Sequence, residues 1–110
     1  MSSLRINKPW GYEELVYNEK YVVKKLFMKN GCRCSLQYHN KKTETIIVLK
    51  GTLTVELEEK IIKLSEFESI TILPLQKHRM SALNNDCLYL EASTTELDDV
   101  IRLEDDYQRI

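Results

Sequence analysis

The sequence is poor in the residues that break or cross-link a chain. Among 110 residues there are only three glycines, two prolines and three cysteines. So few glycines and prolines leave little room for flexible linkers, and this length supports one domain with one core. The odd cysteine set, Cys32, Cys34 and Cys87, provides no disulfide framework, so a reducing cytoplasm is the expected location.

An excess of one charge and long apolar runs are also missing. The formal net charge is -1, so no basic excess is available to offset the phosphates of a nucleic acid. No apolar run approaches the roughly 20 residues of a membrane span, and the N-terminus lacks the pattern of a signal peptide. Neither nucleic acid nor a membrane is therefore expected as a partner.

Short apolar and β-branched segments fill most of the chain. Eight or so strands at this spacing predict an all-β protein, either a sandwich or a barrel. The predicted strands span residues 21–28, 33–39, 45–49, 52–58, 61–64, 69–73, 78–83 and 87–93. Asn84-Asn85-Asp86 is predicted to be a hairpin turn between the last two. The acidic tail, residues 97–107, is the best candidate for a helix, and an irregular segment lying over a sheet edge is the alternative.

Both histidines fall where they could meet one metal ion. Gln37 and His39 are two residues apart on a predicted strand, so their side chains project from the same face. Glu44 follows a polar loop and opens the next strand, while His78 would arrive from a later one. Two imidazoles with oxygen ligands suit zinc, manganese, iron or nickel. A single hydrogen bond between His39 and Glu44 explains the spacing equally well.

The cysteines near this cluster are not predicted to be ligands. Cys32 and Cys34 have even numbers, whereas Gln37 and His39 have odd ones. If the strand already runs through Cys34, alternation turns its thiol away from the site.

Three separated motifs make the chain similar to a known family. The histidine cluster, Gly31-x5-Gln37-x-His39-x4-Glu44-x6-Gly51 followed by Pro74-x3-His78, resembles the two metal-binding motifs of the cupin superfamily. Within that superfamily, Ser35-Leu36-Gln37-x-His39 resembles the type II mannose-6-phosphate isomerase domain. Its opening and closing signatures are matched by Lys8-Pro9-Trp10-Gly11 and by the segment from Asp98 to Arg109.

The resemblance implies a single-domain cupin jelly-roll β-barrel over residues 1–110. We expect an N-terminal segment with the first strand over residues 1–20, the barrel over 21–93 and a tail over 94–110. The resemblance also implies one divalent ion, with zinc or manganese favoured, whose ligands are Gln37, His39, Glu44 and His78. Because a second copy commonly covers the open edges of such a small barrel, a homodimer is expected.

The activity that the resemblance implies is aldose–ketose isomerisation of a sugar phosphate, of the mannose-6-phosphate type. Such a reaction needs an ion that polarises the carbonyl and a base that moves a proton between adjacent carbons. Lys24 and Glu91 are the candidate bases. Lys42, Arg102 and Arg109 are the candidates for holding the substrate, although both arginines could equally tie the tail to the barrel.

Departures from the family pattern leave other functions open. Lys42 replaces an arginine and so loses the bidentate fork for phosphate, and two glycines of the second cupin motif are absent. One alternative is a non-catalytic or regulatory cupin that binds a metal and a sugar. An epimerase or ketoisomerase of nucleotide-linked sugars, or an iron-dependent oxygenase, is another, because this fold hosts many chemistries.

Overall fold

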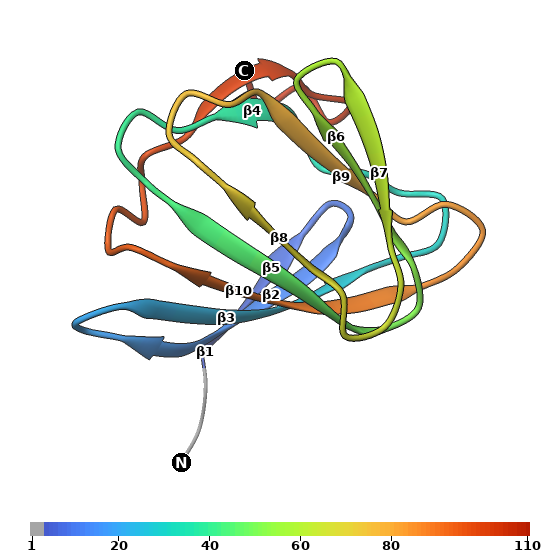
Figure 1. Ribbon diagram of the computed structural model, residues 1–110, viewed down its shortest axis with the longest axis horizontal. Helices are drawn as coiled ribbons and strands as arrows, with labels where there is room; N and C mark the ends of the chain where they lie inside the picture. Colours follow the sequence, from blue (N-terminus) through green and yellow to red (C-terminus); the bar gives the residue numbers. More distant parts are fainter. Residues whose placement is uncertain (1–3) are drawn as a thin grey trace.

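The computed structural model describes residues 4–110, which form eleven β-strands and no helix. Two antiparallel sheets face each other across a shared interior (Figure 1). The all-β expectation is therefore confirmed. The first sheet has six strands in the order β1 (Leu4–Lys8), β2 (Gly11–Asn18), β3 (Val22–Met28), β10 (Cys87–Ser93), β5 (Glu44–Lys50) and β8 (Ser69–Ile72). The second has five, in the order β11 (Ile101–Glu104), β4 (Leu36–Tyr38), β9 (His78–Ser81), β6 (Leu53–Leu57) and β7 (Lys60–Leu64).

Burial alternates along the central strands and so identifies their inner faces. On β5 every second residue from Glu44 to Val48 is buried, and β10 repeats this pattern from Cys87 to Ser93. Successive side chains of a strand point to opposite faces, so these residues line the interior. The pairing between β10 and β5 sets Tyr89 beside Val48 and Glu91 beside Ile46.

The interior changes from apolar to polar along these strands. Leu26, Val48, Val55 and Met80 belong to one cluster of buried apolar side chains. Further along the same inner faces the buried residues become charged or polar, namely His39, Lys42, Glu44, His78 and Glu91. Burying charged groups is costly unless they are paired or bind a metal, so this polar end is the candidate for a functional site.

The N-terminal part contributes two strands where the sequence predicted one. The strands β1 and β2 pair with each other, and β2 also pairs with β3, so this hairpin widens the first sheet. Residues 1–3, the start of the predicted N-terminal segment, lie outside the described residues.

The turn at Asn84-Asn85-Asp86 does not close a hairpin, so that prediction is wrong. It joins β9 to β10, which lie in different sheets. Asn85 instead packs against the β5–β6 turn, where the N–H of Thr52 donates to its Oδ1 at 2.8 Å. At the same turn Gly51 has φ +88, and an added Cβ would lie 2.4 Å from Asn85 Oδ1. Turn residues predict a reversal of the chain but cannot say which sheet receives the next strand.

The tail contains a strand, so the helix prediction for residues 97–107 is wrong. The alternative is right that the tail lies along a sheet edge but wrong that the segment is irregular there. β11 pairs with β4, placing Arg102 beside Gln37 at the edge of the second sheet (Figure 1). Arg79 and Arg33 hold the same segment: Arg79 donates to the backbone carbonyl of Glu104 at 3.1 Å, and Arg33 forms a bidentate pair with Asp106. The unpaired edge of the short β4 thus finds a partner in the tail. In residues 4–110 no helix is long and apolar enough to cross a membrane.

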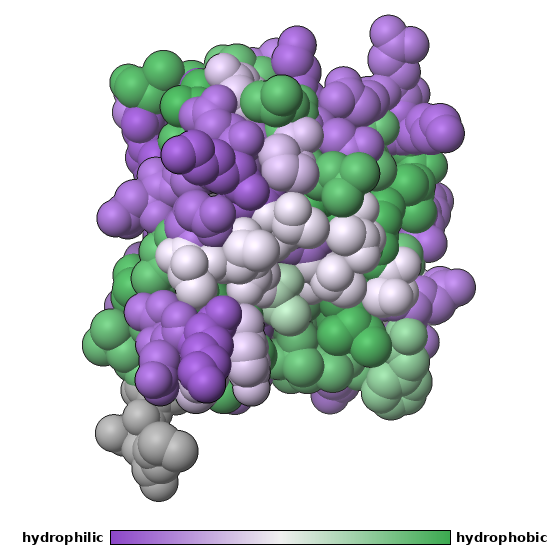
Figure 2. All heavy atoms as spheres, turned by 60° about the vertical axis from the view of Figure 1, so that its left-hand side comes forward, coloured by the Kyte–Doolittle hydropathy of each residue, from purple (hydrophilic) through white to green (hydrophobic). Residues whose placement is uncertain are grey.

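The surface that Figure 2 shows is mixed in character. Hydrophilic side chains form separate clusters, and hydrophobic ones fill areas between them without joining into one continuous apolar face. Scattered exposed apolar side chains of this kind are usual for a folded domain.

Candidate metal centre and cavity

Three side chains from separate strands converge at the polar end of the interior. His39 directly follows β4, Glu44 opens β5 and His78 opens β9. Their ligand atoms lie within 4.8 Å of one another. Oxygen Oε1 of Glu44 is 3.2 Å from Nε2 of His39 and 3.1 Å from Nε2 of His78. All three residues are at most 2% exposed.

Both imidazole rings are oriented by backbone carbonyls. Nδ1 of His39 contacts the carbonyl of Asp99, and Nδ1 of His78 lies 2.9 Å from the carbonyl of Gln76. A carbonyl only accepts, so each Nδ1 carries the hydrogen and donates it. In a neutral ring the other nitrogen, Nε2, then presents a lone pair. This pattern of a ligand histidine held through its second nitrogen is typical of metal sites.

The donor set fits a cation better than a plain hydrogen bond. Two Nε2 lone pairs and a carboxylate oxygen of Glu44 point at one small volume, where they repel each other unless a positive charge lies between them. In the described part of the chain, Nε2 of His78 has no hydrogen-bond partner. A bond between His39 and Glu44 alone does not account for the second imidazole on the same oxygen. Nitrogen and oxygen donors at this spacing suit a divalent transition ion.

Gln37 lies beside this cluster on the cavity wall. It is paired with His78 across β4 and β9. Its Oε1 accepts a hydrogen bond from the hydroxyl of Ser35 at 2.7 Å, which fixes the orientation of the amide. Its role as a fourth ligand stays a prediction.

Lys42 bridges two buried carboxylates next to the centre. Its Nζ lies 3.6 Å from Glu44 Oε2 and 3.3 Å from Glu91 Oε1. Burial raises the pKa of Glu91 to about 8, with the charge of Glu44 adding to the effect and Lys42 opposing it. Burial also acts to raise the pKa of Glu44, but its contacts with His39 and His78, together with the charge of Lys42, hold it well below its usual range. The pKa values of these two neighbouring carboxyl groups are thus shifted in opposite directions.

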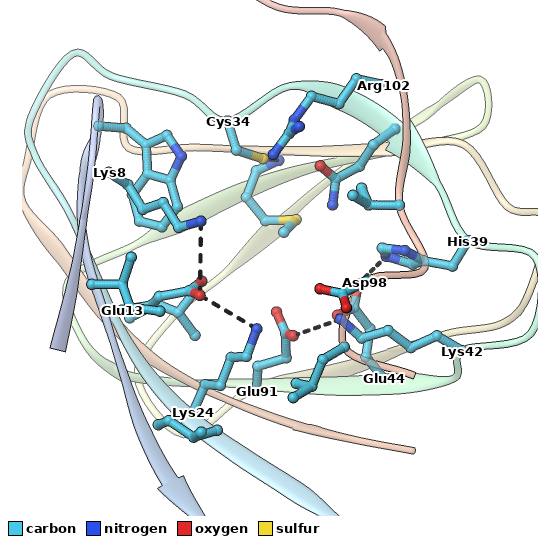
Figure 3. A pocket seen from close by; sticks show the side chains of 18 of the residues that line it. Lys8, Glu13, Lys24, Cys34, His39, Lys42, Glu44, Glu91, Asp98 and Arg102 are labelled. Atoms are coloured by element: carbon cyan, nitrogen blue, oxygen red, sulfur yellow. Dashed lines mark hydrogen bonds and ion pairs between the residues drawn. The ribbon is translucent and has the colours of Figure 1, made fainter. Parts of the chain in front are cut away.

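A cavity of about 450 Å³ opens beside the cluster, within the range of small-molecule sites. Figure 3 shows its charged wall: Lys8 and Lys24 both point at Glu13, and Lys42 points at Glu91. The two lysines lie 3.8 and 3.5 Å from Glu13 Oε1. All the predicted catalytic and substrate residues line this cavity, namely Lys24, Lys42, Glu91, Arg102 and Arg109.

The two predicted arginines differ in what they contact. Arg109 forms a bidentate pair with Asp105 of the same tail, at 2.7 and 3.1 Å, so its charge is already balanced. The Nε of Arg102 is buried and has no hydrogen-bond partner among the described residues. Within residues 4–110, Arg102 therefore keeps an unpaired N–H, whereas the charge of Arg109 is balanced.

Cys34 lines the cavity, and the condition on which its thiol was expected to face away, a regular strand through Cys34, is not met. The regular strand starts only at Leu36, and alternation cannot be extended back from it. Cys34 is not among the residues that form the histidine–glutamate cluster, and its Sγ accepts a hydrogen bond from the N–H of Met80 at 3.3 Å. It is part of the cavity wall.

Asp99 is a site residue that the sequence did not reveal. Its carboxylate accepts hydrogen bonds from the backbone N–H groups of Asn40, Lys41 and Lys42, at 3.0, 2.7 and 3.0 Å. The bonds from Asn40 and Lys41 lower the pKa of Asp99 to about 2. With its carbonyl on His39, Asp99 clamps the loop that joins the two candidate ligands His39 and Glu44. Its place beside Asp98 in the closing motif was the available signal, but nearly 60 residues separate it from that loop.

The two-sheet fold and the buried histidine–glutamate cluster define a cupin. The solved structure of Rru_A2000 from Rhodospirillum rubrum, a cupin-2 domain, superposes with a TM-score of 0.79 at 13% identity, covering 93% of this chain and 74% of that one. The chain belongs to the family described as mannose-6-phosphate isomerase C-terminal, whose model matches residues 2–105.

The names of two curated relatives refer to sugar metabolism. Xanthan biosynthesis protein XanB of Xanthomonas campestris is 34% identical, covering 96% of this chain and 24% of that protein. Mannose-1-phosphate guanylyltransferase ManC of Salmonella typhimurium is also 34% identical, covering 96% of this chain and 23% of that protein. The chain thus spans about a quarter of the length of these relatives.

Proposed function

We propose that this protein is a metal-dependent cupin that binds a sugar phosphate and interconverts its aldose and ketose forms, as in mannose-6-phosphate isomerisation. The observation that carries the proposal is the buried cluster of His39, Glu44 and His78 at the edge of a cavity lined by acidic and basic side chains. Membership of a family named for this reaction supports the same choice.

One divalent ion, with zinc or manganese favoured, would be held by His39, Glu44 and His78, with Gln37 as the fourth ligand. When bound, such an ion polarises a carbonyl and a neighbouring hydroxyl of the sugar. The apolar floor of the cavity lowers the local dielectric and so strengthens polar contacts made there.

Glu91 is the better candidate for the base that moves the proton. It faces the cavity, and Lys42 holds its carboxylate beside the metal ligand Glu44. Lys24 also faces the cavity, but its ammonium group is paired with Glu13. The raised pKa of Glu91, about 8, lies near the neutral range in which a base has to gain and lose a proton. A base must also come within hydrogen-bond reach of the carbon-bound proton, which the position of Glu91 next to the centre favours.

Arg102 is proposed to hold the phosphate. Its guanidinium has a buried, unpaired N–H in the described part of the chain, and a phosphate oxygen would accept from it. Lys42 and Arg109 are already paired with carboxylates, so we assign them to positioning the wall of the site.

A binding-only cupin is the second candidate. It is favoured by the pairing of Lys42 and Arg109 with internal carboxylates, since two of the three predicted phosphate contacts are neutralised. Such a protein would bind the sugar phosphate at the same cavity without changing it.

The test is to mix metal-loaded protein with mannose 6-phosphate and other aldose phosphates and to measure ketose formation and binding in parallel. Turnover that is lost in Glu91→Gln, with metal content unchanged, is the expected result. Glu59→Gln, at an exposed turn, serves as the control and should retain activity. Binding without turnover would select the binding-only cupin, and neither binding nor turnover would refute both.

A further inference from the structure

The hydroxyl of Tyr89 is a buried polar group without a partner. Tyr89 is 0% exposed, and its Oη has no hydrogen-bond partner among residues 4–110. The same residue lines the cavity beside the metal centre. Buried side-chain hydroxyls are paired in the large majority of cases, so an exception calls for a functional explanation.

Strand register places Tyr89 on the floor of the cavity. It precedes Glu91 by two residues on the inner face of β10, and its neighbours on the flanking strands are Val48 and Leu26. Two residues along an antiparallel strand correspond to about 7 Å, so Tyr89 lies one step deeper than Glu91. Other lining residues in this apolar region include Trp10 and Met80.

A single polar group in an apolar floor is typical of a specificity contact. Ligand sites are mostly apolar, with a few placed polar atoms that fix the orientation of the ligand. Burial raises the pKa of Tyr89 well above its usual range, so the phenol keeps its proton and can donate it. A neutral donor suits a hydroxyl or carbonyl oxygen, whereas the charged Arg102 suits an anionic group.

We infer that Tyr89 donates a hydrogen bond to an uncharged oxygen of the ligand and thereby selects sugars that carry an oxygen at that position. The inference rests on the proposed function for the class of ligand, a polyhydroxylated sugar. Tyr89 would thus distinguish sugars by the position of their hydroxyl groups, a role separate from that of the metal centre and of Arg102. A site built around such a bond rejects analogues that lack the oxygen, because its buried donor is then left unpaired.

The experiment compares Tyr89→Phe, which removes only the hydroxyl, with wild type and with Tyr38→Phe. Tyr38 is a half-buried tyrosine of β4 and is not among the lining residues. Binding of mannose 6-phosphate to metal-loaded protein is measured by calorimetry, and the unfolding temperature is measured without ligand. Tyr89→Phe should bind about tenfold more weakly, the loss of roughly one hydrogen bond. It should unfold at the same or a higher temperature, because a buried unpaired hydroxyl does not stabilise the fold.

Two results would overturn the inference. Equal affinity in Tyr89→Phe and wild type would show that the hydroxyl does not contact the ligand. A lower unfolding temperature for Tyr89→Phe, with Tyr38→Phe unchanged, would show that the hydroxyl has a partner in the folded protein itself. Failure of the wild type to bind mannose 6-phosphate, fructose 6-phosphate or mannose is a different outcome, which refutes the proposed function and the inference together.

Discussion

Removing the metal ion should weaken the whole fold, because the cluster that would hold it is buried. Nε2 of His39 and Nε2 of His78 lie 3.2 and 3.1 Å from one oxygen of Glu44, and all three side chains are shielded from water. Without a cation, these lone pairs repel in a low-dielectric interior. A divalent ion removes the repulsion and binds the folded state far better than the unfolded one.

The size of the effect follows from linkage. A ligand present at a thousandfold excess over its Kd stabilises the folded state by about 4 kcal/mol. For a domain of about 100 residues, 1 kcal/mol shifts the unfolding temperature by at least about 4 °C. Saturating zinc or manganese should therefore raise the unfolding temperature of chelator-treated protein by roughly 15 °C or more.

The measurement is scanning calorimetry of chelator-treated protein titrated with each metal, with elemental analysis of the same samples. His39→Ala and His78→Ala should lose both the bound metal and the stabilisation. Lys77→Ala changes the exposed neighbour of His78 and should respond as wild type does. Mg²⁺ should stabilise least, because it prefers an octahedral set of oxygen ligands.

One outcome would refute this reasoning directly. If His78→Ala binds metal with unchanged stoichiometry and is stabilised as strongly as wild type, the histidine–glutamate cluster is not the metal centre.

Three further predictions concern the loop clamp, a turn and the assembly. Asp99→Asn should weaken metal binding about ten- to hundredfold, as loss of outer-shell support does, measured by competition with a chelator. In wild type the pKa of Asp99 is lowered from 3.8 to about 2. The contribution of its carboxylate to stability is therefore complete above pH 3.8 and is lost as the pH falls through about 2. Hydrogen exchange of the amides of residues 40–42 should follow this change, and loss of their protection already above pH 3.8 would contradict it. Gly51→Ala should destabilise the fold by more than about 1 kcal/mol, since φ is +88 and the new Cβ would lie 2.4 Å from Asn85; urea unfolding that matches wild type would argue against the strain. Light scattering should give the mass of two 13.0 kDa chains. The strand β1 is an exposed edge strand whose free backbone groups can pair with a second copy. A monomeric mass at high protein concentration would rule out the dimer.

The sequence revealed the parts of the site that depend on local spacing. Gln37, His39 and Glu44 lie within eight residues, and two strands with one loop suffice to bring them together. His78 was expected to arrive from a later strand, and the resemblance supported that choice. Glu91 and Lys24 were named as candidate bases for the implied reaction, and both lie within regular strands and line the cavity.

What the sequence did not reveal depends on contacts between distant segments. Asp99 reaches the loop after β4 only because β11 pairs with β4, and no local pattern specifies that pairing. Cys34 lies before the regular part of β4, where alternation no longer predicts direction. Tyr89 was indistinguishable from an ordinary strand residue, since only the packed interior shows that its hydroxyl lacks a partner.

The tail also sets an order of events for the metal centre. The ring of His39 is held by the backbone of Asp99, which the ribosome adds sixty residues later. The strands β3 to β10 can pair before that point, whereas the ring of His39 takes its final orientation only when β11 docks. We therefore expect an ion to bind this cluster after the barrel has folded, and a chain that stops before residue 99 should fold into a barrel with a poorly ordered His39.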